Sequence, residues 1–112
     1  MTQTAAYPPV GQVWIFDIGV AQIEHHFISH DEMHYRILTG SMEGAEETVR
    51  IAVEFIRPEV FLVSWQEANK NTVVHVEDFA NGTFHSLLTT PEGHFYRTTG
   101  PMWLRPEADE QE

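Results

Sequence analysis

The sequence predicts an all-β domain, a small up-and-down antiparallel barrel of about eight strands. Three observations predict it: short runs rich in β-branched and aromatic residues, turn-forming residues at short regular intervals, and a length of 112 residues that suits one domain with a real core. Closing a sheet removes its edges, and about eight strands leave an interior just wide enough for one small ligand.

Each predicted strand lies between turn signals. We expect strands over residues 12–16, 20–29, 33–40, 47–55, 60–67, 72–79, 83–89 and 94–99. The strongest turn signal is Asn81-Gly82, because Asn and Gly adopt positive φ at little cost. Around the strands we expect three regions: a flexible segment over residues 1–10, the barrel over 11–101, and an acidic disordered tail over 102–112.

Residues 41–55 also allow a helix, because Glu43, Glu46 and Glu47 would suit a first helical turn. From residue 48 onward, however, apolar and other residues alternate strictly. One face of that segment would carry Val49, Ile51, Val53 and Phe55. Alternation with period two favours a strand.

Composition excludes several classes of function. The formal net charge of −11, with 17 acidic residues against 6 Lys and Arg, argues against a nucleic-acid partner, since few groups are available to neutralise phosphates. No apolar run approaches membrane-spanning length and no signal peptide is visible, so we expect a cytoplasmic protein without a membrane partner. The chain has no cysteine, no Gly-rich phosphate loop and no Gly-x-Ser-x-Gly motif.

The most informative strand is residues 60–67, because it places an acid beside large apolar side chains. With period two, Phe61, Val63, Trp65 and Glu67 share one face. If this face lines a cavity, Glu67 is a partly desolvated acid that would donate or accept a proton or anchor a ligand. The alternative is a solvated glutamate at a strand end, since Glu is rarely buried.

Seven histidines form the next feature, and His85 is the first candidate partner for Glu67. It follows the Asn-Gly turn on a strand expected to neighbour that of His75, so the two imidazoles are expected to meet across the ladder. His75-x-Glu77 has the spacing of metal ligands on a strand, but no His-x-His occurs. We therefore expect no metal and no cofactor, with a histidine-ligated metal barrel as the third alternative.

Other candidate ligand contacts come from two strands. Trp14 and Phe16 share a face of the first strand and would form an aromatic wall together with Phe61 and Trp65, although core filling explains them equally well. Tyr35 and Arg36 alternate, so only one of them faces the interior. Arg36 either anchors a substrate carboxylate or lies at the rim beside a surface glutamate. Apolar residues on both faces of residues 72–76 are compatible with a homodimer.

One resemblance rests on the motif Tyr35-Arg36-Ile37-x-Thr39-Gly40-x-Met42-x-Gly44 followed by Val63-Ser64-Trp65-x-Glu67. From about residue 14 to 84 the chain resembles the phenolic acid decarboxylases, calycin-type barrels similar to lipocalins that decarboxylate hydroxycinnamic acids without a cofactor. The resemblance implies that Glu67 is a catalytic acid. The chain departs from that family at Ala45, where the family has an arginine, and at Trp14 and Phe16, where it has tyrosines.

A second resemblance covers roughly residues 33–100. Phe61-x-Val63-Ser64-Trp65-x-Glu67, then Thr72-Val73-Val74-x-Val76-x-Asp78-Phe79 and Thr89-x-Pro91-x-Gly93-x-Phe95 with Gly100 resemble the MoaF-like family. That family also consists of calycin-type barrels and is named for an association with molybdenum-cofactor biosynthesis. The resemblance implies the fold more than any activity.

Two functions from different classes follow. The first is a small-molecule-binding barrel for a small organic, aromatic ligand, contacted by the aromatic and neighbouring residues Trp65, Tyr35, Trp14, Phe16, Phe61, Val63, His75 and Arg36. The second is a cofactor-independent lyase or isomerase in which Glu67 moves a proton with the help of His85 or His75.

Overall fold

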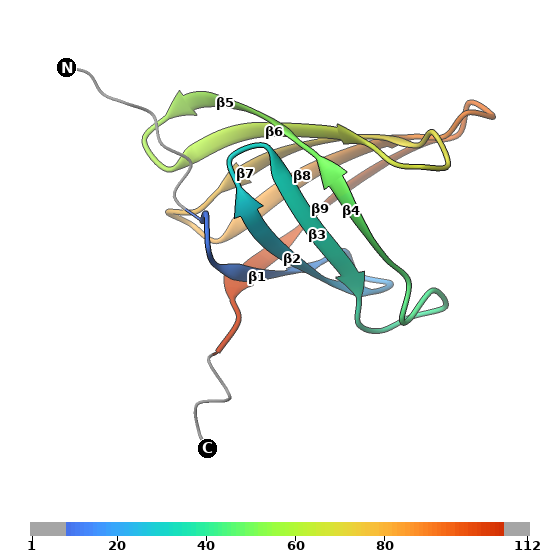
Figure 1. Cartoon of the computed structure of the whole chain (residues 1–112), viewed down its shortest axis with the longest axis horizontal. Helices are drawn as coiled ribbons and strands as arrows, with labels where there is room; N and C mark the ends of the chain where they lie inside the picture. The colour runs from blue at the N-terminus through green and yellow to red at the C-terminus, as the bar shows by residue number, and fades with distance from the viewer. Residues whose placement is uncertain (1–8, 107–112) are drawn as a thin grey trace.

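The computed structural model describes residues 9–106. These residues form nine strands joined in up-and-down order (Figure 1). The strands are β1 (Val13–Asp17), β2 (Gln22–Ser29), β3 (Glu32–Ile37), β4 (Glu46–Arg50), β5 (Ala52–Arg57), β6 (Val60–Gln66), β7 (Thr72–Asp78), β8 (Thr83–Thr89) and β9 (Phe95–Leu104). They form one antiparallel sheet in the order β4-β3-β2-β1-β9-β8-β7-β6-β5. The predicted all-β, up-and-down barrel is confirmed.

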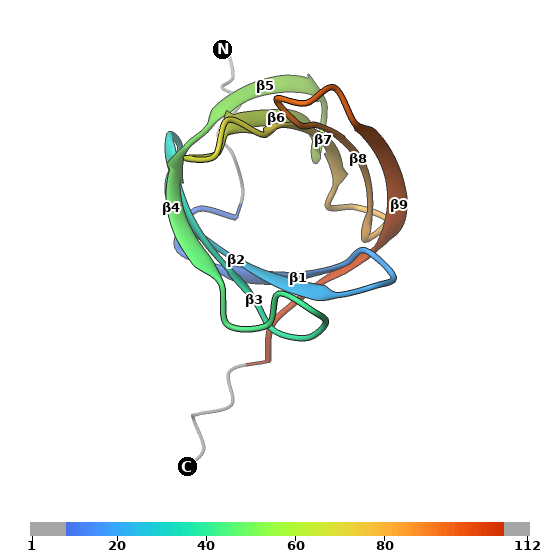
Figure 2. The ribbon, with the colours of Figure 1, turned by 90° about the vertical axis from the view of Figure 1, so that its right-hand side faces the viewer.

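One bent segment nearly closes the barrel. β4 and β5 stand at opposite ends of the strand order, yet only Ile51 separates them along the chain. β4 pairs with β3, whereas β5 pairs with β6. Figure 2 shows the resulting ring, in which the green segment passes from β4 into β5. The single strand predicted over residues 47–55 is therefore two strands, and the helix considered there does not form.

The last strand is longer than predicted. β9 continues from Phe95 to Leu104, and its final residues pair with β1 from Trp14 to Phe16. Gly100 permits this continuation, because a Cβ at that position would collide with the carbonyl oxygen of Asp17. The barrel thus extends past the predicted boundary at residue 101. Residues 107–112 of the predicted tail, and residues 1–8 of the predicted flexible segment, lie outside the described residues.

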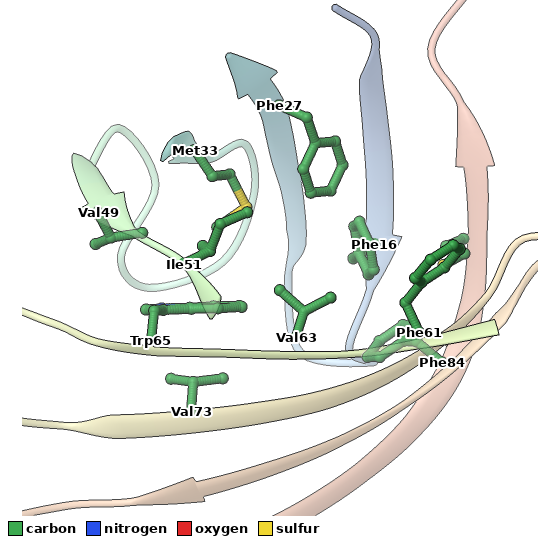
Figure 3. Close-up of a cluster of buried hydrophobic side chains, with 11 residues drawn as sticks. Phe16, Phe27, Met33, Val49, Ile51, Phe61, Val63, Trp65, Val73 and Phe84 are labelled. Carbon is green, nitrogen blue, oxygen red and sulfur yellow. The ribbon is translucent and has the colours of Figure 1, made fainter. Parts of the chain in front are cut away.

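The core fills the interior of the ring. Alternation with period two sends one face of every strand inward. Figure 3 shows side chains from β1, β2 and β3 pointing toward those of β6. The buried cluster consists of Phe16, Phe27, Met33, Val49, Ile51, Phe61, Val63, Trp65, Val73, Phe84 and Met102. None of the described residues belongs to a helix long and apolar enough to cross a membrane.

The turn between β7 and β8 fixes the register of these two strands. Gly82 has φ of 69°, as expected for the Asn-Gly sequence. The carboxylate of Asp78 accepts hydrogen bonds from the backbone N–H groups of Ala80 and Asn81 and from the Asn81 side-chain amide, at 2.8 to 3.0 Å. These bonds hold the loop so that Asp78 pairs with Thr83, which determines which residues of β8 face inward.

Candidate functional site

Glu67 directly follows β6 and opens the loop that leads to β7. Phe61, Val63 and Trp65 are buried on the inner face of β6, as the alternation predicts, and Glu67 continues that row in a half-buried position. The loop is closed by the Glu67 N–H, which donates to the carbonyl oxygen of Asn71 at 2.8 Å. The Lys70 N–H in turn donates to the Glu67 carbonyl oxygen at 2.8 Å, and Lys70 adopts φ of 76° to do so.

Two side chains hold the Glu67 carboxylate in place. The indole N–H of Trp65 donates to Oε2 at 3.2 Å, and the Asn71 side-chain amide donates to Oε1 at 3.3 Å. Burial raises the pKa of Glu67 above its ordinary value; the two donors oppose this shift, and the charge of Glu47 adds to it. Glu67 is therefore an acid with a partly desolvated carboxyl group at one end of the barrel interior.

Glu47 and Tyr35 lie beside Glu67. The Tyr35 hydroxyl donates to Oε1 of Glu47 at 2.9 Å, and the Ala68 N–H donates to Oε2 of Glu47 at 2.8 Å. Burial, followed by the charges of Glu67 and Glu47, raises the pKa of Tyr35. The phenol therefore stays protonated and remains a hydrogen-bond donor between two carboxylates.

A second polar group lies deeper in the barrel. His75 Nδ1 is 3.0 Å from Oε2 of Glu77. Both residues are buried, with 5% of His75 and 0% of Glu77 exposed. The imidazole of His25 stacks on Phe16 with ring centroids 4.1 Å apart. Its centroid is 5.8 Å from that of His75, and the two imidazoles are nearly parallel. The inner face thus places a His-Glu pair and a second histidine among aromatic rings.

Trp65 joins the two polar groups. Its ring centroid is 4.9 Å from that of His75 and 5.8 Å from that of His25, while its N–H binds Glu67. The charge of His75 also lowers the pKa of Glu67, although by less than burial raises it. His75 is therefore the histidine that acts electrostatically on the predicted acid.

The expected meeting of His75 and His85 is wrong. His85 pairs with Val76 in the β7–β8 ladder, while His75 pairs with Ser86, so the two imidazoles lie on opposite faces of the sheet. His85 is exposed on the outside of the barrel, where its Nδ1 lies 3.0 Å from the hydroxyl of Thr99. The structure does not bring His85 to Glu67.

The aromatic residues of the predicted wall lie together inside the barrel: Phe16, Phe61 and Trp65 belong to the buried cluster, and Trp14 packs against it. The rings of Trp14 and Phe61 both contact Phe79, with centroid distances of 4.9 and 6.4 Å. Phe16 instead contacts Phe84 at 5.1 Å, next to the histidines. The aromatic side chains therefore run along the barrel interior as parts of one packed cluster.

The remaining predicted contacts divide between the two faces of the sheet. Val63 is buried at the centre of the core, and Tyr35 is half-buried on the inner face. Arg36 is exposed on the outer face, so it is Tyr35 and not Arg36 that faces inward. The structure therefore contradicts the prediction that Arg36 anchors a substrate carboxylate inside the barrel.

Three polar residues of the interior were not predicted as site residues. Glu47, His25 and Glu77 all lie on the inner face with the polar groups described above. The signal that would have found them is the alternation itself, because Glu47 is two residues before Val49 and His25 is two residues before Phe27. Among residues 9–106, no cluster of three or more His, Asp or Glu side chains is arranged to hold a metal ion.

Comparisons with known proteins agree with this architecture. The chain is similar to a crystal structure of a protein from Burkholderia vietnamiensis described as a candidate β-lactamase, with 26% identity and a TM-score of 0.85, over 91% of this chain and 100% of that chain. No curated protein matches. A family model described as MoaF-like matches residues 10–103, which include β1 to β8 and almost all of β9. The chain therefore belongs to the MoaF-like family.

Proposed function

We propose that this chain is a small-molecule-binding barrel that holds an aromatic ligand at the end of the interior where Glu67 lies. The observation that carries the proposal is the half-buried Glu67 carboxylate, oriented by the Trp65 indole N–H at 3.2 Å and by Asn71. Small-molecule sites typically combine aromatic surface with a few well-placed polar groups. Trp65 and Tyr35 supply the aromatic surface here, and Glu67 and Glu47 supply acceptors.

The charges at this end favour an uncharged or cationic ligand. Glu67 and Glu47 lie together, and the charge of Glu47 raises the pKa of Glu67. All six Lys and Arg residues lie among the described residues, and each of them is exposed. A ligand carboxylate would therefore meet two acids and would lose its hydration without gaining a cation in exchange.

Nuclear magnetic resonance with three small probes tests this proposal. Phenol, benzylamine and benzoate are titrated into ¹⁵N-labelled protein. We expect the Trp65 indole and Asn71 side-chain amide signals to move with phenol and benzylamine, and to stay in place with benzoate. Glu67→Gln is expected to weaken benzylamine binding, whereas Glu54→Gln, which changes an exposed glutamate on β5, leaves it unchanged. Shifts confined to outer-face residues such as Arg36, or no shifts at all, would refute the proposal.

A cofactor-independent lyase or isomerase is the second candidate, favoured by the raised pKa of Glu67. A general acid is most effective when its pKa lies near the working pH. The phenolic acid decarboxylases combine such an acid with an arginine and tyrosines, whereas this chain has Ala45, Trp14 and Phe16 at the matching positions. We therefore expect p-coumarate and ferulate to keep their conjugated-acid absorbance. A loss of absorbance that Glu67→Gln abolishes would favour the lyase.

The Burkholderia protein is described as a candidate β-lactamase, but the sequence of this chain does not support hydrolysis of β-lactams by a serine nucleophile. Serine enzymes of that class use a Ser-x-x-Lys motif, and no serine of this chain has a lysine three residues later.

A further inference from the structure

The loop between β7 and β8 contains the one Asn-Gly dipeptide of the chain, Asn81-Gly82. Asparagine followed by glycine is especially prone to deamidation, because glycine has no side chain to hinder attack by its backbone nitrogen. The other two asparagines, Asn69 and Asn71, are followed by lysine and threonine. Asn81 is also exposed, so water has access to its side chain.

The reaction takes place within the chain and needs only water. The backbone nitrogen of Gly82 attacks Cγ of Asn81, and the proton of this nitrogen passes through solvent to the side-chain nitrogen. The bond between Cγ and that nitrogen then breaks, and ammonia leaves. Water opens the resulting succinimide ring at either carbonyl, which gives aspartate or isoaspartate. In isoaspartate the main chain runs through the side-chain carbon and is one methylene longer.

The structure restrains both nitrogens that take part. The Gly82 N–H donates to the carbonyl oxygen of Asp78 at 2.9 Å, so the attacking nitrogen is held through its own proton. The side-chain amide of Asn81, which would leave as ammonia, donates to Oδ2 of Asp78 at 2.8 Å. The backbone N–H of Asn81 donates to Oδ1 of Asp78 at 3.0 Å. Ring closure must break the first two of these hydrogen bonds, and each one therefore slows the reaction.

The carboxyl group of Asp78 is a restraint and not an acid catalyst. The hydrogen bond from the Asn81 side chain, followed by the one from the Asn81 backbone N–H, lowers the pKa of Asp78. The group is therefore ionised at neutral pH and has no proton to give to a departing amide nitrogen. Both of its oxygens already accept hydrogen bonds from the loop.

We propose that Asn81 is a site of spontaneous deamidation and that Asp78 is the positioning residue that sets its rate. The proposal is independent of the proposed function. The product would disturb the loop, because a new carboxylate would face that of Asp78 in place of the 2.8 Å hydrogen bond. Isoaspartate would also lengthen the loop that places Asp78 opposite Thr83, and would displace Gly82, whose carbonyl oxygen accepts from the Met102 N–H of β9 at 2.9 Å.

Rates of deamidation at neutral pH test this proposal. Intact mass spectrometry follows the exchange of an NH for an oxygen, and peptide mapping with isoaspartate methyltransferase labelling locates it. The folded wild type is compared with a synthetic peptide of residues 76–85. Asp78→Ala removes both side-chain acceptors, whereas Asp78→Asn keeps an acceptor for the backbone N–H groups and loses the one for the Asn81 amide. The control is Asp31→Ala, which removes an exposed turn carboxylate between β2 and β3.

All proteins are incubated well below their melting temperatures, so that the folded state is the one that reacts. We expect Asn81 to deamidate about tenfold faster in the peptide and in Asp78→Ala than in the wild type, as the loss of ordinary hydrogen bonds allows. Asp78→Asn is expected to lie between them, and Asp31→Ala to match the wild type. Equal rates in the peptide and the wild type, or in the wild type and both Asp78 variants, overturn the role of Asp78.

Earlier reaction at Asn69 or Asn71 than at Asn81 overturns the assignment of the site. If Asp78→Ala does not fold, the peptide and Asp78→Asn decide the matter.

Discussion

Glu47 joins β4 to the loop after β6, because its Oε2 accepts a hydrogen bond from the backbone N–H of Ala68 at 2.8 Å. These two segments lie where the sheet is not continuous, since β4 pairs with β3 and β5 pairs with β6. The same carboxylate binds the Tyr35 hydroxyl through its other oxygen. One side chain therefore bridges β4 and the loop after β6, where the sheet is not continuous, and helps to form the polar group around Glu67.

Removing the Glu47 carboxylate is expected to loosen this part of the barrel. Glu47→Ala leaves the Ala68 N–H and the Tyr35 hydroxyl without their acceptor, which costs about 1–3 kcal/mol of unfolding free energy. Urea denaturation measures the loss, and amide hydrogen exchange locates it through faster exchange at Ala68. Glu54→Ala, at an exposed position on β5, serves as the control. Unchanged exchange at Ala68 would show that the hydrogen bond does not bridge these segments.

Glu67 is expected to make the protein less stable as the pH rises. Its folded-state pKa is raised above the ordinary value of 4.5, so the native protein binds the proton more tightly than the unfolded chain does. Unfolding free energy therefore falls as the pH increases through the interval above 4.5 and stays lower once the native carboxyl is ionised. The Glu67→Gln variant lacks this titrating carboxyl. Its unfolding free energy is therefore expected to fall less between pH 4 and 8 than that of the wild type.

Urea denaturation across that pH range provides the comparison. Glu54→Gln controls for the loss of one negative charge from an already acidic protein. If the wild-type and Glu67→Gln curves run parallel, the carboxyl of Glu67 is solvated as in the alternative of a strand-end glutamate.

Tyr35 is expected to ionise at a higher pH than an ordinary tyrosine. Burial and the neighbouring charges of Glu67 and Glu47 raise its pKa above the usual value of 10.0. At pH 10 the folded wild type and Tyr35→Phe should therefore show the same tyrosinate absorbance, and a difference should appear only after unfolding in urea. A lower absorbance of folded Tyr35→Phe would contradict the buried hydrogen bond to Glu47.

The His75–Glu77 pair is expected to contribute to the stability of the barrel. Glu77 is 0% exposed, so Glu77→Ala leaves a buried imidazole nitrogen without its partner, at a cost of about 1–3 kcal/mol. Glu77→Gln keeps an acceptor for His75 Nδ1 and should cost clearly less. A double-mutant cycle with His75→Phe measures the coupling between the two side chains. A coupling near zero would mean that Glu77 owes its position to other contacts.

The sequence was sufficient for the fold and for the row of β6 side chains. Phe61, Val63 and Trp65 follow strict alternation, and a one-residue error would have exposed three large apolar groups, so their placement is strongly determined. Alternation also places Glu47 on the face of Val49, but no sequence signal marks the break at Ile51 that separates β4 from β5. β-Branched residues continue across Ile51 without a turn signal.

The error at His85 has a different origin. Two residues on neighbouring strands share a face only in certain registers, and the loop between the strands sets that register. Four residues, Phe79 to Gly82, separate the paired residues Asp78 and Thr83, and with this loop length an odd-numbered residue of β7 lies opposite an even-numbered residue of β8. His75 therefore shares its face with Ser86. Asn-Gly predicts that a turn occurs, but it does not determine how many flanking residues stay unpaired.

A ¹³C nuclear magnetic resonance titration of the Glu67 side-chain carboxyl tests the account most directly. An inward, partly desolvated acid beside a second carboxylate requires a midpoint above 4.5, and Glu47→Gln should move that midpoint downward. A Glu67 midpoint at or below 4.5, unaffected by Glu47→Gln, would contradict the account.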